Sequence, residues 1–567
     1  MNTKAQSKEK SIVVQERDVP IRMRDGTILA ADIFRPEAEE KFPALLALSP
    51  YGKEKQSLAI PPQPPEAPLY NPGIEAGDPE YLVSRGYAHI IADLRGSGKS
   101  EGEYRGWMSK QEAEDGHDLV EWVAEQPWCD GNVGMSGISY FGAIQLSVAA
   151  EQPPHLKAIM PFNAPADFYR ECTHHGGVVQ TFFLHLYGNS IKSNAVSVTF
   201  EDNPPKKTKQ LMEAARSDPD IRMYPDICAI VENPKKIPCF FDVLVNPMDG
   251  PFYWERSAHT KYDKIKIPCY FSSGWWAYAH MHLRGVFQNY LGIDAPKKLM
   301  INRPVVLDRP LPREFNEETL RWYDYWLKGV DTGIMDEPPI KLFVRGVNRW
   351  RFEHEWPLKR TEWTKYHLRR WQRLLTKPEG SSGRPDCFVQ QPHSETAAVS
   401  SVSYMTPPMG EDMEVTGPIS LKLYASIDTD DTNWIVVLKD VFPDGSELEL
   451  SRGWLKASHR AIEKSRSKPW LPYHPHTETL RVVPGEIHEY DIELSPISNV
   501  FEVSHCIKLV ITSMDHAKAL VSPPAVGSSH LPYHICSSTT TFHKIYHDES
   551  SPSHLLLPVI GNTEGPC

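Results

Sequence analysis

The chain has little cysteine for its 567 residues. Its nine cysteines are an odd number, scattered, with no C-x-x-C pair. This usage argues against a disulfide framework or a cysteine zinc site and is typical of a reducing compartment, so we expect a cytoplasmic protein.

Long apolar runs are also missing: no stretch approaches the roughly 18 apolar residues of a membrane-spanning helix, and residues 1–18 lack the apolar centre of a signal peptide. The sequence therefore predicts no membrane association.

Positive charge is scarce as well. Lys and Arg number 61 against 73 Asp and Glu, which gives a formal net charge of −12. Neutralising the phosphates of a nucleic acid requires an excess or a stripe of basic residues, and neither is present. Nucleic acid is therefore not an expected partner.

Proline, in contrast, is abundant: 50 residues, about 9% against a usual value of roughly 5%. With 40% hydrophobic and 24% charged residues the composition is that of a folded protein, and proline at this density indicates many turns and loops. The length is enough for several domains.

The order of predicted elements divides the chain into three parts. Strands alternate with helices in residues 1–162 and 261–337, a pattern that predicts an α/β domain with a mostly parallel sheet covered by helices on both faces. Residues 163–260 contain short helical pieces rich in Pro and His, which we interpret as a helical cap insertion over the sheet. In residues 338–567, beginning with Ile340–Val344, short alternating strands separated by turns predict an all-β domain, a sandwich or jelly roll.

A glycine-rich turn between a predicted strand and a predicted helix is the most informative motif. It reads Gly137-Ile138-Ser139-Tyr140-Phe141-Gly142. A serine on a strained strand-to-helix turn needs glycine neighbours because side chains there would collide, and the following helix start supplies a backbone N–H to an oxyanion. We predict Ser139 as a nucleophile and the Tyr140 N–H as an oxyanion donor, against the alternative of a turn that only packs. Ser136 precedes the turn and is interpreted as structural.

Further motifs occur in order along nearly the whole chain: Met23-Arg24-Asp25-Gly26, Asp93-Leu94-Arg95-Gly96-Ser97-Gly98, Trp128 to Met135 before the turn, Gly274-Trp275, Leu342-Phe343-Val344, Trp350-Arg351 and Glu355-Trp356-Pro357-Leu358. With them the sequence resembles the cocaine-esterase-like (CocE/NonD) family of serine hydrolases, relatives of the X-Pro dipeptidyl peptidases. The resemblance implies an α/β-hydrolase domain, a helical cap and a C-terminal jelly roll, and it suggests a homodimer. It also implies that Tyr51, after Pro50, is the second oxyanion donor.

Two positions depart from the pattern that the resemblance implies. Ala277 stands where the family has its acid, after Gly274-Trp275-Trp276, and Leu307 stands where it has its histidine. A serine hydroxyl is a weak nucleophile without a base, and loss of the base can cost about 10⁶ in kcat. Because the triad is degenerate, our first expectation is an enzyme repurposed for a non-hydrolytic step (cyclisation, addition or a lyase reaction) that uses the retained oxyanion pocket.

Two alternatives remain open. A working serine esterase or amidase would use Ser139 with a relocated acid or base, for which His280, His282 and Asp308 are the candidates. A pseudoenzyme would only bind its ligand. Labelling of Ser139 by a fluorophosphonate is expected for the esterase or amidase alone.

The expected ligand is a hydrophobic small molecule with a carbonyl group. Trp275 and Trp276 follow the C-terminal end of a predicted strand, where open α/β sheets bind ligands, and we expect them to line an apolar pocket with Ala277, Leu307 and Phe182. Simple core packing is the alternative for the aromatic residues. No cofactor is expected: the segment from Asp93 to Gly98 lacks the order of a phosphate-binding loop, and the adjacent His174 and His175 lack metal-ligand spacing.

Overall fold

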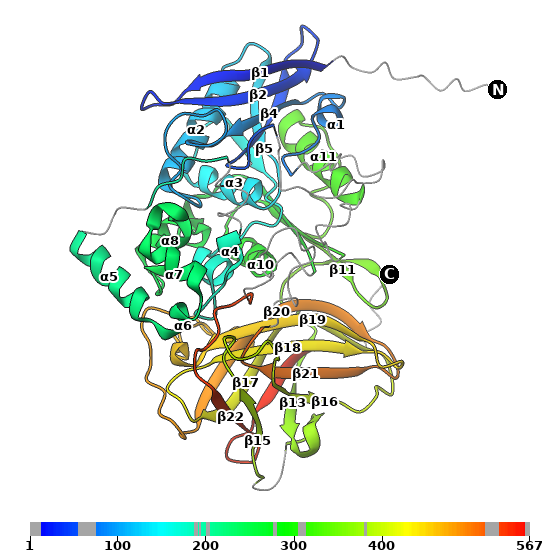
Figure 1. Ribbon diagram of the computed structural model, residues 1–567. Coiled ribbons are helices and arrows are strands. Elements are labelled where there is room, and N and C mark those ends of the chain that lie inside the picture. Colours follow the sequence, from blue (N-terminus) through cyan, green and yellow to red (C-terminus); the bar gives the residue numbers. More distant parts are fainter. Residues whose placement is uncertain are drawn as a thin grey trace, which may run out of the picture.

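The computed structural model describes residues 13–54, 75–185, 191, 194–199, 205–275, 281–303, 313–378, 383–515 and 532–561. Its first domain is built on a ten-stranded sheet (Figure 1). The central strands are parallel, and antiparallel strands close both edges. In sheet order the strands are β1 (Val13–Arg22), β2 (Ile28–Pro36), β4 (Ala88–Asp93), β3 (Phe42–Ser49), β5 (Cys129–Met135), β6 (Leu156–Ile159), β9 (Cys269–Gly274), β10 (Lys297–Asn302), β11 (Ile340–Val344) and β12 (Arg349–Glu353).

Helices cover both faces of this sheet. Successive residues of a strand point to opposite faces, and Leu45 and Leu46 accordingly lie in two separate hydrophobic clusters. One cluster includes buried residues of α2 (Lys110–Ala124), α3 (Tyr140–Ala150) and α10 (Leu283–Gly292), and the other those of α1 (Pro79–Val83) and α11 (Arg313–Lys328). Burial on both faces explains the continuous apolar runs of β3 and β4. The expected α/β domain is present.

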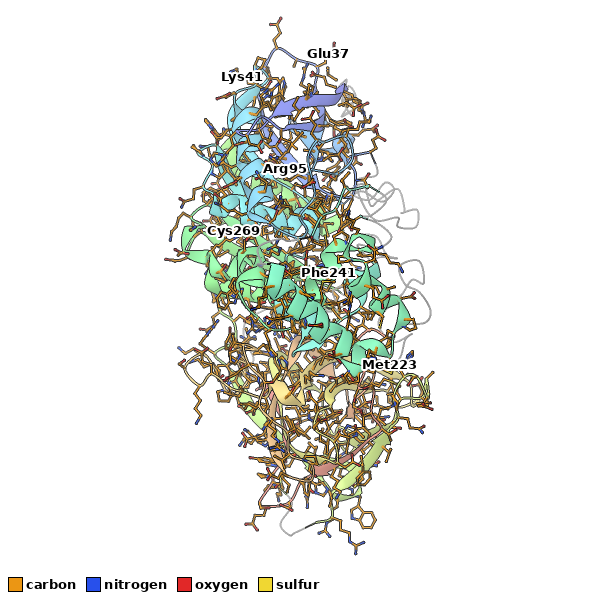
Figure 2. The ribbon with its side chains drawn as sticks, turned by 60° about the vertical axis from the view of Figure 1, so that its left-hand side comes forward. Glu37, Lys41, Arg95, Met223, Phe241 and Cys269 are labelled. Atoms are coloured by element: carbon orange, nitrogen blue, oxygen red, sulfur yellow. The ribbon has the colours of Figure 1, made fainter. Side chains whose placement is uncertain are left out.

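The segment between β6 and β9 is largely helical. Five of its described α-helices begin with proline, a residue that suits the first helical turn because its missing N–H has no partner there. In the turned view Phe241 and Met223 mark the path of these helices from the sheet domain toward the β domain (Figure 2). The elements are a π-helix η2 (Phe168–Thr173), β7 (His174–His175), β8 (Val178–Val179), α4 (Phe182–His185), α5 (Pro205–Ser217), α6 (Pro219–Arg222), α7 (Pro225–Glu232), η4 (Pro234–Lys236), α8 (Pro238–Leu244), α9 (Pro251–Arg256), η5 (Ala258–Thr260) and η6 (Tyr262–Lys264).

The C-terminal domain is an eleven-stranded sheet that closes on itself. Because β17 pairs with both β20 and β23, the strands β17, β20, β19, β18, β21, β16, β14, β13 and β23 form a continuous circuit, and β22 and β15 extend from β17. The bounds are β13 (Thr361–Arg369), η8 (Arg370–Gln372), β14 (Arg373–Leu375), β15 (Asp386–Gln390), β16 (Ser401–Met405), β17 (Met413–Ile427), β18 (Asn433–Val441), β19 (Glu447–Lys456), η9 (Ala457–His459), β20 (His488–Phe501), β21 (Cys506–Thr512), β22 (Thr541–Tyr546) and β23 (His554–Ile560).

The expectation that Ile340–Val344 belongs to the all-β domain is wrong. Ile340–Val344 pairs in parallel with β10, and Arg349–Glu353 follows it antiparallel, so both strands belong to the first sheet. β11 lies second from the edge of this sheet, and its residues alternate between buried and partly buried positions as those of a β-sandwich strand do. This is why its sequence pattern suggested the other domain. Within the described residues no helix is long and apolar enough to cross a membrane.

Candidate active site

Ser139 occupies a strained turn between β5 and α3. Its backbone has φ 58° and ψ −112°, a conformation that a non-glycine residue adopts only when its surroundings impose it. The Ser139 N–H donates to the Phe162 carbonyl at 2.9 Å, and the Ser139 carbonyl accepts the N–H of Ala143 at 2.8 Å. The structure therefore gives Ser139 the geometry that the glycine-rich motif predicts.

The two glycines beside this serine stand at positions where no side chain would fit. A Cβ on Gly137, whose φ is 129°, would lie 2.4 Å from the Cβ of Phe141. A Cβ on Gly142 would lie 2.3 Å from the carbonyl oxygen of Phe162. The second contact is with backbone and cannot be relieved by a rotamer change, so Gly142 allows α3 to pack against the segment after β6.

We expect Gly142→Ala to destabilise the fold by about 1–3 kcal/mol, the usual cost of overpacking, and to slow any reaction at Ser139 because α3 must shift. Chemical denaturation measures the first effect. Gly410→Ala is the matched control, because nothing lies within 4 Å of its added Cβ, and its effect should stay within about 0.5 kcal/mol. Equal stability of the two variants would contradict the tight packing inferred at the turn.

A histidine lies against the serine. His282 Nε2 is 3.3 Å from Ser139 Oγ, and the His282 side chain is buried at the start of α10. This places one of the three predicted acid or base candidates beside Ser139. His280 and Asp308, together with Trp276, Ala277 and Leu307, lie outside the described residues.

Tyr51 is held beside the same turn. Its buried ring meets the Tyr140 ring edge-on, with centroids 5.8 Å apart. The Asp93 carboxylate fixes the chain just after Tyr51, since it accepts the backbone N–H of Lys53 at 2.6 Å and that of Lys99 at 3.0 Å. A Cβ on Gly98 would lie 2.1 Å from an Asp93 oxygen. The segment from Asp93 to Gly98 thus supports the site structurally.

A buried carboxyl group below Tyr140 was not predicted. The Tyr140 hydroxyl donates to Glu112 Oε2 at 2.6 Å, and the Tyr104 hydroxyl lies 3.0 Å from the Tyr140 oxygen. Burial raises the pKa of Glu112 to about 8. Ser109 and Glu112 form a capping box at the start of α2, a signal readable in the sequence. That signal marks the start of a helix, but it does not predict the contact with Tyr140. The contact holds the Tyr140 side chain in place, and the backbone N–H of Tyr140 is the predicted oxyanion donor.

Comparisons with known proteins identify the family of the chain. A family model described as X-Pro dipeptidyl-peptidase (S15 family) matches residues 25–304, and one described as the X-Pro dipeptidyl-peptidase C-terminal non-catalytic domain matches residues 332–556. The structure of a CocE/NonD family hydrolase from Staphylococcus aureus superposes with a TM-score of 0.76 at 25% identity, over 97% of this chain and 94% of that one. The chain belongs to the CocE/NonD hydrolases of the S15 family.

Other members and neighbours of the family cover the chain equally well. Cocaine esterase from Rhodococcus sp. (strain MB1 Bresler) is 26% identical over 96% of this chain and 98% of its own length. The structure of an α-amino acid ester hydrolase matches with a TM-score of 0.74 at 17% identity, over 98% of both chains, which shows the shared fold. The matches thus extend over both domains of this chain.

Two other predicted pocket residues are described in this CocE/NonD chain. Trp275 is fully buried, and its indole N–H donates to the carbonyl of Phe343 on β11. This contact favours the core-packing alternative for Trp275. Phe182 is buried at the start of α4 and lies in the same hydrophobic cluster as Tyr51 and Tyr140.

The paired histidines of the insertion have separate partners. His174 Nδ1 lies 2.9 Å from the Thr173 hydroxyl, whereas His175 Nδ1 lies 3.1 Å from His534 Nε2 in the β domain. In the part of the chain that the structure describes, no three or more His, Cys, Asp or Glu side chains are grouped to hold a metal ion.

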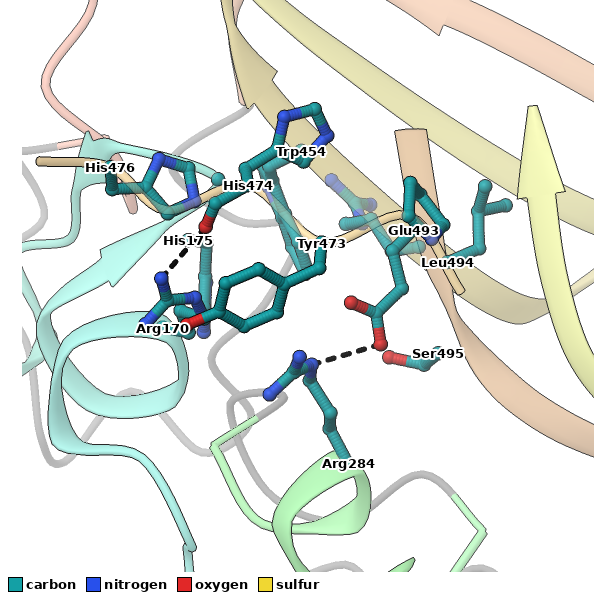
Figure 3. A pocket seen from close by; sticks show the side chains of 13 residues that line it. Arg170, His175, Arg284, Trp454, Tyr473, His474, His476, Glu493, Leu494 and Ser495 are labelled. Atoms are coloured by element: carbon teal, nitrogen blue, oxygen red, sulfur yellow. Dashed lines mark hydrogen bonds and ion pairs between the residues drawn. The ribbon is translucent and has the colours of Figure 1, made fainter. Parts of the chain in front are cut away.

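Ion pairs fix the start of α10, where His282 lies. Arg284, two residues further on, pairs with Glu171 of the insertion at 2.9 Å. It also pairs with Glu493 on β20 at 2.9 Å (Figure 3). A Cβ on the next residue, Gly285, would lie 2.3 Å from Glu171 Oε2, so the helix sits directly on that segment. A cavity of about 60 Å³ adjoins this junction. The insertion, α10 and the β domain therefore meet next to His282, the histidine that lies against Ser139.

Proposed function

We propose that this chain is a serine hydrolase, an esterase or amidase, that acts on hydrophobic small-molecule esters or amides with Ser139 as nucleophile and His282 as general base. The observation that carries the proposal is the 3.3 Å approach of His282 Nε2 to Ser139 Oγ at a strained strand-to-helix turn. Membership of a family of esterases and peptidases supports it, and favours it over the non-hydrolytic step that the two departures from the family pattern suggested.

In the proposed mechanism His282 replaces the missing base. Its Nε2 takes the Ser139 proton while Oγ attacks the substrate carbonyl, and it then gives that proton to the leaving alcohol or amine. The Tyr140 N–H and the Tyr51 hydroxyl receive the oxyanion of each tetrahedral intermediate. Water attacks the acyl-enzyme by the same route and regenerates Ser139. The base thus comes from the helix after β9, whereas the family pattern places it after β10.

The direct test is the intact mass of the protein after incubation with a fluorophosphonate, together with turnover of a p-nitrophenyl ester and of the matching p-nitroanilide. We expect the mass of one label per chain and release of p-nitrophenol. Release of p-nitroaniline as well would assign amidase activity. Absence of both label and turnover would overturn the proposal and return attention to non-hydrolytic chemistry in the same pocket.

Removal of the hydroxyl in Tyr51→Phe should lower kcat by roughly 10²-fold, the usual loss for one oxyanion donor. KM should change little, because the donor acts on charge that develops in the transition state. Steady-state kinetics on the p-nitrophenyl ester measure both constants. Tyr81→Phe also removes a tyrosine hydroxyl, from α1 and outside the proposed oxyanion site; it is the control and should leave kcat unaltered. An unchanged kcat in both variants would remove Tyr51 from the mechanism.

We also expect Glu493 to act as a positioning residue for His282 through Arg284. Glu493→Gln keeps an acceptor but removes the charge, so the start of α10 is held less firmly. A small misplacement of a catalytic group is costly, up to about 10²-fold for 1 Å, and we expect a kcat roughly three- to tenfold lower at unchanged KM. Glu489→Gln, on the same strand and paired with Lys422, is the matched control. Equal kcat values in the two variants, or a KM effect alone, would contradict the positioning role.

A further inference from the structure

A second, larger cavity lies between the helical insertion and the β domain. Its volume is about 440 Å³, in the range of small-molecule sites. Neither Ser139, Tyr51 nor His282 is among the residues that line it, so it is separate from the proposed catalytic pocket. Much of its wall is apolar and comes from both parts of the chain: Val178, Val179, Leu211, Ala214, Ala215, Ile221, Leu244, Pro247, Met248 and Ile535.

The charged residues around this cavity are mostly acidic. Four aspartates and one lysine line it, which leaves a formal charge of −3. Lys456 lies between two of them, 3.7 Å from Asp220 and 3.5 Å from Asp431. Asp218 and Asp430 have no ion-pair partner among the described residues. The cavity therefore offers two carboxylates without a direct ion pair in the described part of the chain, although Lys456 attracts Asp218 over a longer distance.

A neutral imidazole also faces this space. His459 is only 4% exposed, and its Nδ1 lies 3.1 Å from the Nδ1 of His476. Burial, with a further contribution from Lys456, lowers the pKa of His459 to about 4, so the ring is uncharged at neutral pH. His459 is among the residues that line the cavity, and its Nε2 makes no hydrogen bond within the described residues. When Nδ1–H donates to His476, Nε2 is a hydrogen-bond acceptor.

We propose that this cavity binds a small primary amine with an apolar body. An ammonium group carries three N–H donors and one positive charge, which match the aspartates and the His459 Nε2, while the apolar wall takes the body of the ligand. The net charge disfavours an anion. The cavity borders both the insertion and the β domain, so an occupant would contact both.

The proposal is tested by calorimetric titration of the full chain with three probes of similar size, 2-phenylethylamine, 2-phenylethanol and 3-phenylpropionate. We expect the amine to bind at least tenfold more tightly than the alcohol, and the carboxylate not to bind. Because ligand binding to the folded state stabilises it, the amine alone should also raise Tm. Equal affinity for amine and alcohol would overturn the assignment of a cation site.

Variants locate the site. Asp218→Asn with Asp430→Asn should raise Kd for the amine about fivefold, a change typical of two partly exposed charges; asparagine can still accept the Asp220 N–H at the start of α6. Asp226→Asn with Asp263→Asn removes the same charge from exposed positions that do not line the cavity and should leave Kd unaltered. An equal loss in the two pairs would mean general surface attraction and overturn the proposal.

Ser139→Ala separates this site from the catalytic one. It should bind the amine as the unmodified chain does, whether or not the chain hydrolyses esters. Loss of binding in Ser139→Ala would place the amine in the catalytic pocket instead.

Ala215→Phe fills the cavity from the α5 side and should abolish amine binding. Circular dichroism checks that this variant is folded. If a folded Ala215→Phe variant still binds the amine, the proposed location is wrong.

Discussion

Replacement of Ser139 by alanine should abolish fluorophosphonate labelling and lower kcat for the p-nitrophenyl ester by about 10⁴- to 10⁶-fold, the range found when a serine hydrolase loses its nucleophile. The reason is local: Oγ is the atom that would bond to the substrate carbonyl, and the turn at φ 58° holds it 3.3 Å from His282 Nε2. Binding and oxyanion stabilisation would remain and account for residual turnover. Intact mass and steady-state kinetics measure the two effects.

Ser136→Ala is the matched control for this experiment. Ser136 lies in the same stretch, but its N–H donates to the carbonyl of Leu46 on β3, before the turn. It should keep full labelling and nearly full kcat. If the label survives in Ser139→Ala and disappears in Ser136→Ala, the nucleophile is Ser136, and the role proposed for Ser139 is wrong.

Replacement of His282 by glutamine should cost a similar factor, about 10⁴- to 10⁶-fold in kcat. Glutamine fills much of the same space but cannot take a proton from Ser139, so attack on the carbonyl loses its general base. KM should change far less, because substrate binding does not depend on proton transfer. The labelling rate with fluorophosphonate should fall in parallel, since that reaction also needs an activated serine.

His280→Gln distinguishes the two neighbouring histidines. We expect it to retain most of the activity, because the structure brings His282 to Ser139. The opposite result, an inactive His280→Gln and an active His282→Gln, would move the base by two residues and refute the role given to His282. The double variant of Ser139 and His282 should be no worse than either single one, as residues of one catalytic unit are strongly non-additive.

Several features of the site were predictable because they depend on neighbours in the sequence. The turn around Ser139 needs glycine at 137 and 142, and those glycines stand beside it in the chain. The alternation of strands and helices predicted the α/β domain. The pattern of residues 163–260 predicted short helices, and five of the described α-helices there begin at a proline. The family resemblance added the order of domains, which the family models confirm.

Features of the site that depend on contacts between residues distant in the sequence were left open by the sequence or were not predicted from it. The sequence named three acid or base candidates but could not choose among them, because the partner of Ser139 lies 143 positions away. Glu112 reads as a helix cap, and only the packing of α2 against α3 turns its carboxyl to Tyr140.

The sequence by itself determined the strained turn at Ser139, the family and the α/β domain followed by a β domain, since local conformation and motif spacing are properties of neighbouring residues. Only the tertiary structure decided which histidine meets Ser139, which sheet Ile340–Val344 joins, and that aspartates at 218 and 430 border one cavity. The physical reason is the same in each case: hydrogen bonds, strand pairing and charge act across short distances in space, and the folding of the whole chain sets those distances.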